Sequence, residues 1–260
     1  IEILAVCLMS NHMHEIVFDR YGLIAKFLQR RNAMFANMIK VRYGLSGSVF
    51  EKCDGKYNRL EGARAVAEKI AYVLANPVAA GLVASREEWP GFVSSVADLS
   101  GSAVLIARPL EYVSKKKKRN PANVTFAMGA PAEVRALFCD LSTMTAVVSA
   151  ELVQRIRSAR RRHAGRFAGR SRVLATSPYS RATSREPFGG RVPRFTTAGD
   201  LAAAKRIIAE MRAFREAHRR AFEASRGGKR RVTFPAGTGK MHFTYGYPRE
   251  EYAVASGRAA

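Results

Sequence analysis

The first hundred residues alternate between strand-like apolar runs and segments with a helical spacing of apolar positions. Residues 1–9 and 12–18 are short apolar runs, and the Ser10-Asn11 pair between them is typical of a hairpin turn. Residues 22–43 have apolar side chains three and four positions apart, which predicts one amphipathic helix. The expected apolar face of this helix consists of Ile24, Phe27, Leu28, Phe35, Met38 and Ile39.

A second helix follows after a short break. Gly44 predicts the end of the first helix, and residues 46–53 are a short strand candidate. Residues 61–75 again have helical spacing. Pro77 predicts the end of this helix, because the residue before a proline avoids the helical conformation. The order strand, strand, helix, strand, helix predicts an α+β fold in which helices pack on an antiparallel sheet.

Beyond Trp89 the chain becomes basic and mainly helical in pattern. Residues 114–121 predict an exposed basic linker, and residues 131–164 predict a helix that ends in an arginine-rich run. Residues 170–196 are rich in Arg, Ser, Pro and Gly, which indicates loop or disorder. Residues 197–228 predict an amphipathic helix. Its expected caps are Thr197 and Asp200 at the start and Gly227 at the end, and its expected apolar face consists of Leu201, Ile208, Met211, Phe214 and Phe222.

These patterns divide the chain into three expected parts. Residues 1–100 form the α+β domain, residues 101–130 a basic linker, and residues 131–260 a basic helical extension with loops and partial disorder. The chain opens in the middle of an apolar run without an initiating Met, and we therefore expect a preceding segment that contributes the first strand of the sheet.

Charge separates the first part from the rest. The 260 residues have a formal net charge of +23 at pH 7. Residues 1–100 hold 12 Lys/Arg and 10 Asp/Glu, whereas the remaining residues hold 32 and 11. Such a basic excess favours a polyanionic partner, and nucleic acid is the usual one. A membrane-spanning segment is not expected, because no apolar run approaches the roughly 18 residues that a span needs. Three widely spaced cysteines and no visible signal peptide predict reduced thiols in the cytoplasm.

Two histidines in one strand are the first candidate site. Residues i and i+2 of a strand point to the same face, so His12 and His14 are expected to lie side by side, which suits a divalent cation.

A second group of candidate residues lies on the second helix. Tyr72 and Asn76 are four residues apart and share one helix face, and Lys69 joins them three residues earlier. If this helix crosses the sheet, Tyr72 supplies a nucleophilic phenolate and Asn76 an oxygen ligand; otherwise Tyr72 is a core residue and Asn76-Pro77 a helix stop.

The motifs together resemble a known family. "LMSNHMH" (Leu8–His14), "GSVFE" (47–51), "YVLANPVAAGLV" (Tyr72–Val83) and "WPGFVSS" (89–95) occur in the order found in single-tyrosine HUH transposases. The REP-associated tyrosine transposases are the branch that these motifs resemble. The resemblance covers about residues 1–97 and implies a ferredoxin-like or RRM-like fold. A long C-terminal extension lies outside it.

The resemblance implies specific roles. The His-hydrophobe-His pair that binds Mg²⁺ or Mn²⁺ in the family falls on His12 and His14, the catalytic tyrosine on Tyr72, and the third metal ligand on Asn76. The implied reaction is a nick in single-stranded DNA beside a hairpin, through a 5′-phosphotyrosine that is later rejoined. Such an enzyme is bacterial, cytoplasmic and nucleoid-associated, and a homodimer and a monomer both remain open. Basic side chains expected to contact DNA phosphates are Lys69, Lys115, Lys116, Lys117, Lys118, Arg119, Arg160, Arg161 and Arg162.

One residue departs from the family pattern, and two other functions remain open. Glu15 replaces an aliphatic residue on the strand face opposite the histidines, where a carboxylate requires a partner or an exposed edge. A non-catalytic relative that only binds hairpin DNA is one alternative. A replication-initiator or relaxase nickase is another, but it often has paired tyrosines or a third metal-binding histidine, and neither is visible in the sequence.

Overall fold

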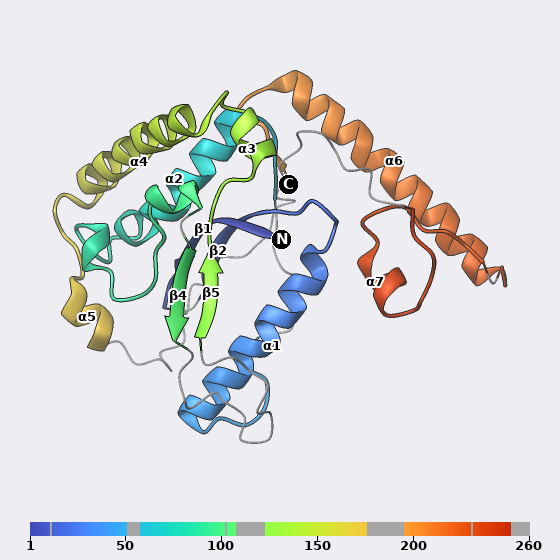
Figure 1. Cartoon of the computed structure of the whole chain (residues 1–260), viewed down its shortest axis with the longest axis horizontal. Coiled ribbons are helices and arrows are strands. Elements are labelled where there is room, and N and C mark those ends of the chain that lie inside the picture. The colour runs from blue at the N-terminus through green and yellow to red at the C-terminus, as the bar shows by residue number, and fades with distance from the viewer. Residues whose placement is uncertain are drawn as a thin grey trace.

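The centre of the molecule is an antiparallel hairpin (Figure 1). The structure is a computed structural model, and it describes residues 1–10, 12–50, 58–101, 103–107, 123–175, 195–229 and 231–250. Strands β1 (Glu2–Leu8) and β2 (Met13–Phe18) pair as the sequence predicts. The segment Phe92–Ser94 follows the other edge of β1: the Leu8 amide donates to the Phe92 carbonyl at 2.8 Å, and the Ser94 amide donates to the Val6 carbonyl at 2.9 Å.

Helices cover both faces of this sheet. Helix α1 (Ile24–Tyr43) lies below the hairpin in Figure 1, and α2 (Ala63–Ala79) crosses the opposite face. Gly44 ends α1 with a left-handed backbone, as predicted. The fold is therefore of the α+β class, with a small two-stranded antiparallel sheet. The predicted strand at 46–53 is not formed over residues 46–50, and residues 51–53 lie outside the described residues.

Pro77 does not end α2, contrary to the prediction. The helix continues through Pro77 to Ala79. A proline in a helix has no amide hydrogen to donate, and its ring crowds the carbonyl four residues earlier, but in the last turn this cost falls on one position of the helix. The turn is held instead by the Ala80 amide, which donates to the Asn76 carbonyl at 2.9 Å, and by the fully buried side chain of Val78.

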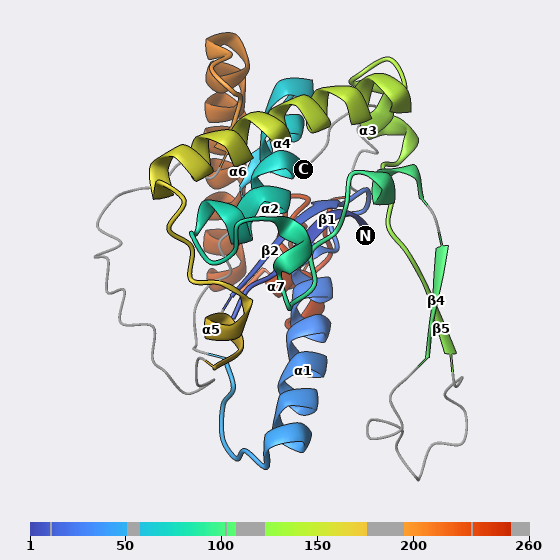
Figure 2. The same ribbon diagram turned by 90° about the vertical axis from the view of Figure 1, so that its left-hand side faces the viewer.

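A third layer lies on the outer side of α2. Helix α4 (Leu141–His163) packs along α2, and Figure 2 shows it running across the upper part of the molecule. The short helix α3 (Ala132–Ala136) precedes it, so the helix predicted over 131–164 is broken. The break is at Cys139, which has a positive φ of 73°, and α4 restarts where the Asp140 side chain accepts a hydrogen bond from the Thr143 amide.

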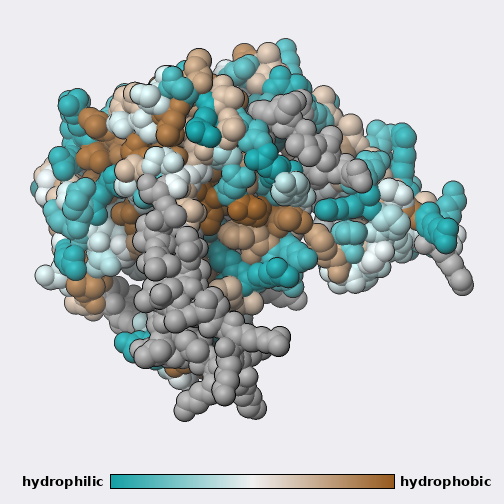
Figure 3. Space-filling model, in the orientation of Figure 1, coloured by the Kyte–Doolittle hydropathy of each residue, from teal (hydrophilic) through white to brown (hydrophobic). Residues whose placement is uncertain are grey.

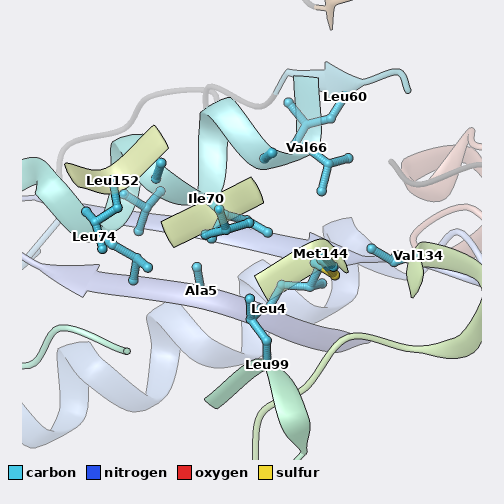
Figure 4. Packing of buried hydrophobic residues seen from close by; sticks show 14 of the residues in the cluster. Leu4, Ala5, Leu60, Val66, Ile70, Leu74, Leu99, Val134, Met144 and Leu152 are labelled. Carbon is cyan, nitrogen blue, oxygen red and sulfur yellow. The ribbon is translucent and has the colours of Figure 1, made fainter. Parts of the chain in front are cut away.

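One core joins these layers. Leu4, Ile70, Leu74, Met144 and Leu152 are buried together, and Figure 4 shows their side chains converging from β1, α2 and α4. The core therefore extends across the division that the sequence predicts between residues 100 and 131. Burial of apolar side chains is the main favourable contribution to folding, so α4 contributes to the stability of the hairpin and α2.

Apart from one long helix near the C-terminal end of the described chain, the remaining elements are short. Strands β4 (Ala103–Ala107) and β5 (Asn123–Ala127) form an antiparallel pair inside the expected linker, and the residues between them lie outside the described residues. Helix α5 (Arg170–Ala175) lies in the region expected to be loop, whose residues 176–194 are also outside the described residues. The other short elements are β3 (Arg59–Leu60), the 3₁₀ turns η1 (Arg86–Glu88) and η2 (Ala97–Ser100), β6 (Phe195–Thr196) and α7 (Gly239–Phe243).

Helix α6 (Leu201–Arg226) is formed as predicted, with Asp200 as its N-cap and Gly227 after its last residue. Its apolar face was predicted less well. Ala203, Ile207 and Ala221 are buried, but four of the expected face residues are exposed. The cause is the position of α6, which lies along the outside of the molecule, so that only part of its side is covered (Figure 1). The four exposed residues are Leu201, Ile208, Phe214 and Phe222.

Candidate functional site

The two histidines lie at the turn of the hairpin. His12 is the last residue before β2, and its carbonyl accepts a hydrogen bond from the Met9 amide at 2.8 Å. His14 is in β2, opposite Cys7. The Nε2 atoms of the two imidazoles are 3.1 Å apart and the rings are edge to face. Spacing by two residues thus brings the two rings together, as the sequence predicts.

Tyr72 comes to this pair from α2. Its ring is edge to face with that of His14, with the centroids 5.4 Å apart. The side chain is 38% exposed, so Tyr72 is half open to solvent and is not a core residue. Lys69, one turn earlier, places Nζ 5.5 Å from the centroid of the Tyr72 ring. Neighbouring residues of α2, among them Ile70, Ala71 and Val73, face the core and fix the helix over the sheet.

Asn76 lies one turn beyond Tyr72 on the same helix face. It is 6% exposed, and its carbonyl oxygen belongs to the helix hydrogen bonds through the Ala80 amide. The described residues contain no group of three or more His, Cys, Asp and Glu side chains that could bind a metal ion. A cation at the two imidazoles therefore requires oxygen ligands of another kind, such as the amide of Asn76, substrate or water.

Burial favours the neutral form of both imidazoles. It lowers the pKa of His12, and burial together with repulsion from a protonated His12 lowers the pKa of His14. A neutral imidazole retains the nitrogen lone pair that a metal ion needs. The electrostatics of the site therefore suit a cation at neutral pH.

Glu15, which departs from the family pattern, lies on the face of β2 opposite the histidines. Its carboxylate forms an ion pair with Arg31 of α1, and both side chains are largely buried. Glu15, Met13 and Phe27 are among the residues that line a cavity of about 620 Å³ between the sheet and α1. Glu15 thus has the partner that the sequence requires. The sequence does not single out Arg31, because the helical spacing of apolar residues such as Phe27 and Met38 marks only the apolar face of α1.

Helix α4 holds the C-terminal end of α2. Arg160 donates from Nε and Nη2 to the Ala84 carbonyl, at 3.1 and 3.0 Å. The His163 Nε2 lies 3.0 Å from the Ala79 carbonyl oxygen. Cationic and N–H-bearing groups stabilise the free carbonyls at the end of a helix. His163 thus stabilises the end of the helix that carries Tyr72, and Arg160, which the sequence assigns to DNA, holds the turn that follows this helix.

The other residues expected to contact DNA differ in placement. Arg161 and Arg162 are exposed near the end of α4. Lys115, Lys116, Lys117, Lys118 and Arg119 lie outside the described residues. Within the described part of the chain, no helix has the length and apolar character that crossing a membrane requires.

Replacing Gly81 with Ala is expected to weaken the junction between α2 and α4. Gly81 has a φ of +72°, and a Cβ there would lie 2.8 Å from Cε1 of His163. The backbone strain costs about 1–2 kcal/mol, and moving His163 loses about 1 kcal/mol more of hydrogen bonding. Gly44→Ala is the matched control, because Gly44 has a φ of +62° and nothing within 4 Å of its Cβ position. Urea unfolding should show the larger loss for Gly81→Ala; equal losses would contradict the contact with His163.

Cys7 is expected to be an unreactive thiol. Burial raises its pKa to about 11, and the charge of Arg86 lowers it only in part. The thiolate is the reactive form, so iodoacetamide at pH 8 should label exposed Cys139 at least about tenfold faster than Cys7, as measured by peptide mass spectrometry. Since the folded pKa is above the unfolded value, the buried thiol contributes full stability below pH 9.0, and this contribution is lost as the pH rises through about 11. Equal labelling of the two residues would show that β1 opens readily.

The structure therefore brings His12, His14, Tyr72 and Lys69 into one half-exposed site at the turn of the hairpin, with Asn76 one helical turn away. Comparisons of the chain with models of known protein families, with curated proteins and with solved structures find no match.

Proposed function

We propose that the protein is a metal-dependent DNA transposase that nicks and rejoins single-stranded DNA through Tyr72. The observation that carries the proposal is the edge-to-face contact of Tyr72 with His14, which is itself paired with His12. A half-exposed phenol beside two neutral imidazoles is the arrangement that the HUH resemblance implies. Each motif is local in sequence, whereas the contact joins β2 to α2, so the geometry adds to what the resemblance implies.

The two imidazoles suit one shared cation. Adjacent ligands of an octahedral ion, each about 2.1 Å from it, lie about 3 Å apart. The Nε2 atoms of His12 and His14 are 3.1 Å apart. Mg²⁺ or Mn²⁺ held there supplies Lewis acidity toward a phosphate oxygen. Asn76 is the protein oxygen ligand that we propose, since it is one turn from Tyr72 on the same face of α2.

The proposed chemistry uses the Tyr72 hydroxyl as the nucleophile. Its oxygen forms a bond to the phosphorus of a backbone phosphate and gives up its proton to solvent. The bond from phosphorus to the 3′ oxygen of the preceding nucleotide breaks, and that oxygen takes a proton from solvent. The products are a 5′-phosphotyrosine and a free 3′-hydroxyl, so rejoining needs no external energy. Lys69, whose Nζ is 5.5 Å from the Tyr72 ring centroid, would contact a phosphate oxygen by its charge.

A labelled oligonucleotide tests this function. The substrate is a single strand with a hairpin from DNA that flanks the coding sequence, incubated with Mg²⁺ or Mn²⁺. We expect a covalent protein–DNA adduct that EDTA prevents and that His12→Ala/His14→Ala abolishes. His242→Ala is the control, because His242 belongs to a separate contact with the Tyr247 carbonyl. Binding without an adduct would favour the non-catalytic alternative, and an adduct unaffected by EDTA would overturn the role of the metal.

A further inference from the structure

Helix α6 has a row of four arginines along one exposed side. Arg212, Arg215, Arg219 and Arg226 are spaced by three, four and seven residues, which places them along one stripe of an α-helix. All four are exposed, and none forms an ion pair within the described residues. At 1.5 Å per residue, the stripe is about 21 Å long. Figure 1 shows α6 along the outside of the molecule, away from the hairpin turn.

Two other arginines of α6 are neutralised by carboxylates of the chain. Arg206 pairs with Glu61, and Arg220 pairs with Glu216. Glu210, on another side of α6, pairs with Arg59. Glu223 lies beside the stripe but forms no ion pair with its arginines in the described chain. Glu210 and Glu216 thus neutralise other cations, and the four arginines leave the stripe with a net positive charge.

We infer that this stripe is a binding surface for the phosphate backbone of double-stranded nucleic acid. A straight row of fixed cations matches the fixed row of phosphates of a duplex, which carries one charge for about every 1.7 Å of its axis. Arginine is well suited to phosphate, because its guanidinium donates two parallel hydrogen bonds. Contacts of this kind are independent of base sequence. The surface is separate from Tyr72 and does not depend on the proposed nicking reaction.

Two other polyanions fit the stripe less well. A membrane-bound amphipathic helix inserts a continuous apolar face. The buried apolar residues of α6 face the protein, and the exposed Ile208 and Phe222 are separated along the helix by the arginines of the stripe. Single strands are held mainly by aromatic side chains that stack on bases. The aromatic residue beside the stripe, Phe222, is already stacked on His218, with an interplanar angle of 12°. Figure 3 shows mainly hydrophilic and neutral colours toward the outer end of α6.

The salt dependence of duplex binding tests this inference. A 30-base-pair DNA of arbitrary sequence is titrated with the wild-type protein and with the fourfold variant Arg212→Gln/Arg215→Gln/Arg219→Gln/Arg226→Gln between 50 and 200 mM salt. Each lost phosphate contact reduces the slope of log K against log salt by about 0.9, so the variant's slope should be smaller by about 3–4. Between 50 and 200 mM salt, the wild type should therefore lose on the order of 10²-fold more affinity for the duplex than the variant loses.

Two controls make the result decisive. The matching Arg→Lys variant keeps the charge and should retain the wild-type salt slope, and thermal melting checks that both variants fold. Tyr72→Phe should bind duplex DNA as the wild type does, so a failure of the nicking proposal is distinguishable from a failure of this one. An unchanged salt slope in the Gln variant overturns the inference. Wild-type binding to anionic phospholipid vesicles in preference to duplex DNA overturns it as well.

Discussion

Tyr72→Phe should abolish the covalent DNA adduct, by on the order of 10³-fold or more, because it removes the proposed nucleophile and leaves the ring in place. Binding of the single-stranded substrate should change little, because the ring keeps its contacts with His14 and Lys69. Stability should change by less than about 0.5 kcal/mol, since the side chain is half exposed. Denaturing gel electrophoresis with a labelled oligonucleotide measures the adduct, and urea unfolding measures the stability.

Tyr43→Phe is the matched control for this change. Tyr43 is also exposed, but it lies at the end of α1, far along the chain from the histidines. We expect full adduct formation from this variant. An adduct that persists in Tyr72→Phe and disappears in Tyr43→Phe would move the reaction away from the hairpin turn.

Met144→Ala should destabilise the protein by about 2–5 kcal/mol, because Met144 is fully buried and its removal leaves a cavity between α4 and α2. The same variant should lose adduct formation at temperatures well below the wild-type midpoint, since α4 supports the helix that carries Tyr72. Urea unfolding followed by circular dichroism gives the free energy of unfolding.

Two adjacent valines of α4 provide a control of matched chemistry. Val148 is 0% exposed and Val147 is 40% exposed. Val148→Ala should cost about 1.5–3 kcal/mol and Val147→Ala less than about 0.5 kcal/mol. Similar costs for the two would mean that α4 does not pack on the core in solution, and the division of the chain near residue 100 would then be a true domain boundary.

Local patterns were sufficient for the hairpin and the long helices. The period of two in residues 12–18 and the helical periods before Gly44 and Gly227 depend only on neighbouring residues, and the structure confirms the elements. The meeting of His12 with His14 follows from the same period. The approach of Tyr72 to His14 required the resemblance to a family, because spacing alone left Tyr72 open as a core residue.

Long-range packing explains what the sequence did not reveal. The burial of α4 against α2 depends on contacts between residues about eighty positions apart, such as His163 with Ala79. The same packing keeps Pro77 inside α2, where local preference predicts a stop. Arg160 belongs to a basic run that predicts phosphate contacts, and long-range packing also places its guanidinium on the Ala84 carbonyl. A charge pattern indicates a class of partner, but it does not show which charges the fold itself uses.

Electron spin-echo spectroscopy of the Mn²⁺-loaded protein is the most direct test of the proposed centre. Imidazole nitrogen bound to Mn²⁺ gives a characteristic ¹⁴N modulation. We expect two such nitrogens in the wild type, one in His12→Ala or His14→Ala, and an unchanged signal in His242→Ala. A spectrum with water and phosphate couplings alone would show that the two rings hold no cation, and the assignment of Tyr72 as a metal-assisted nucleophile would then be wrong.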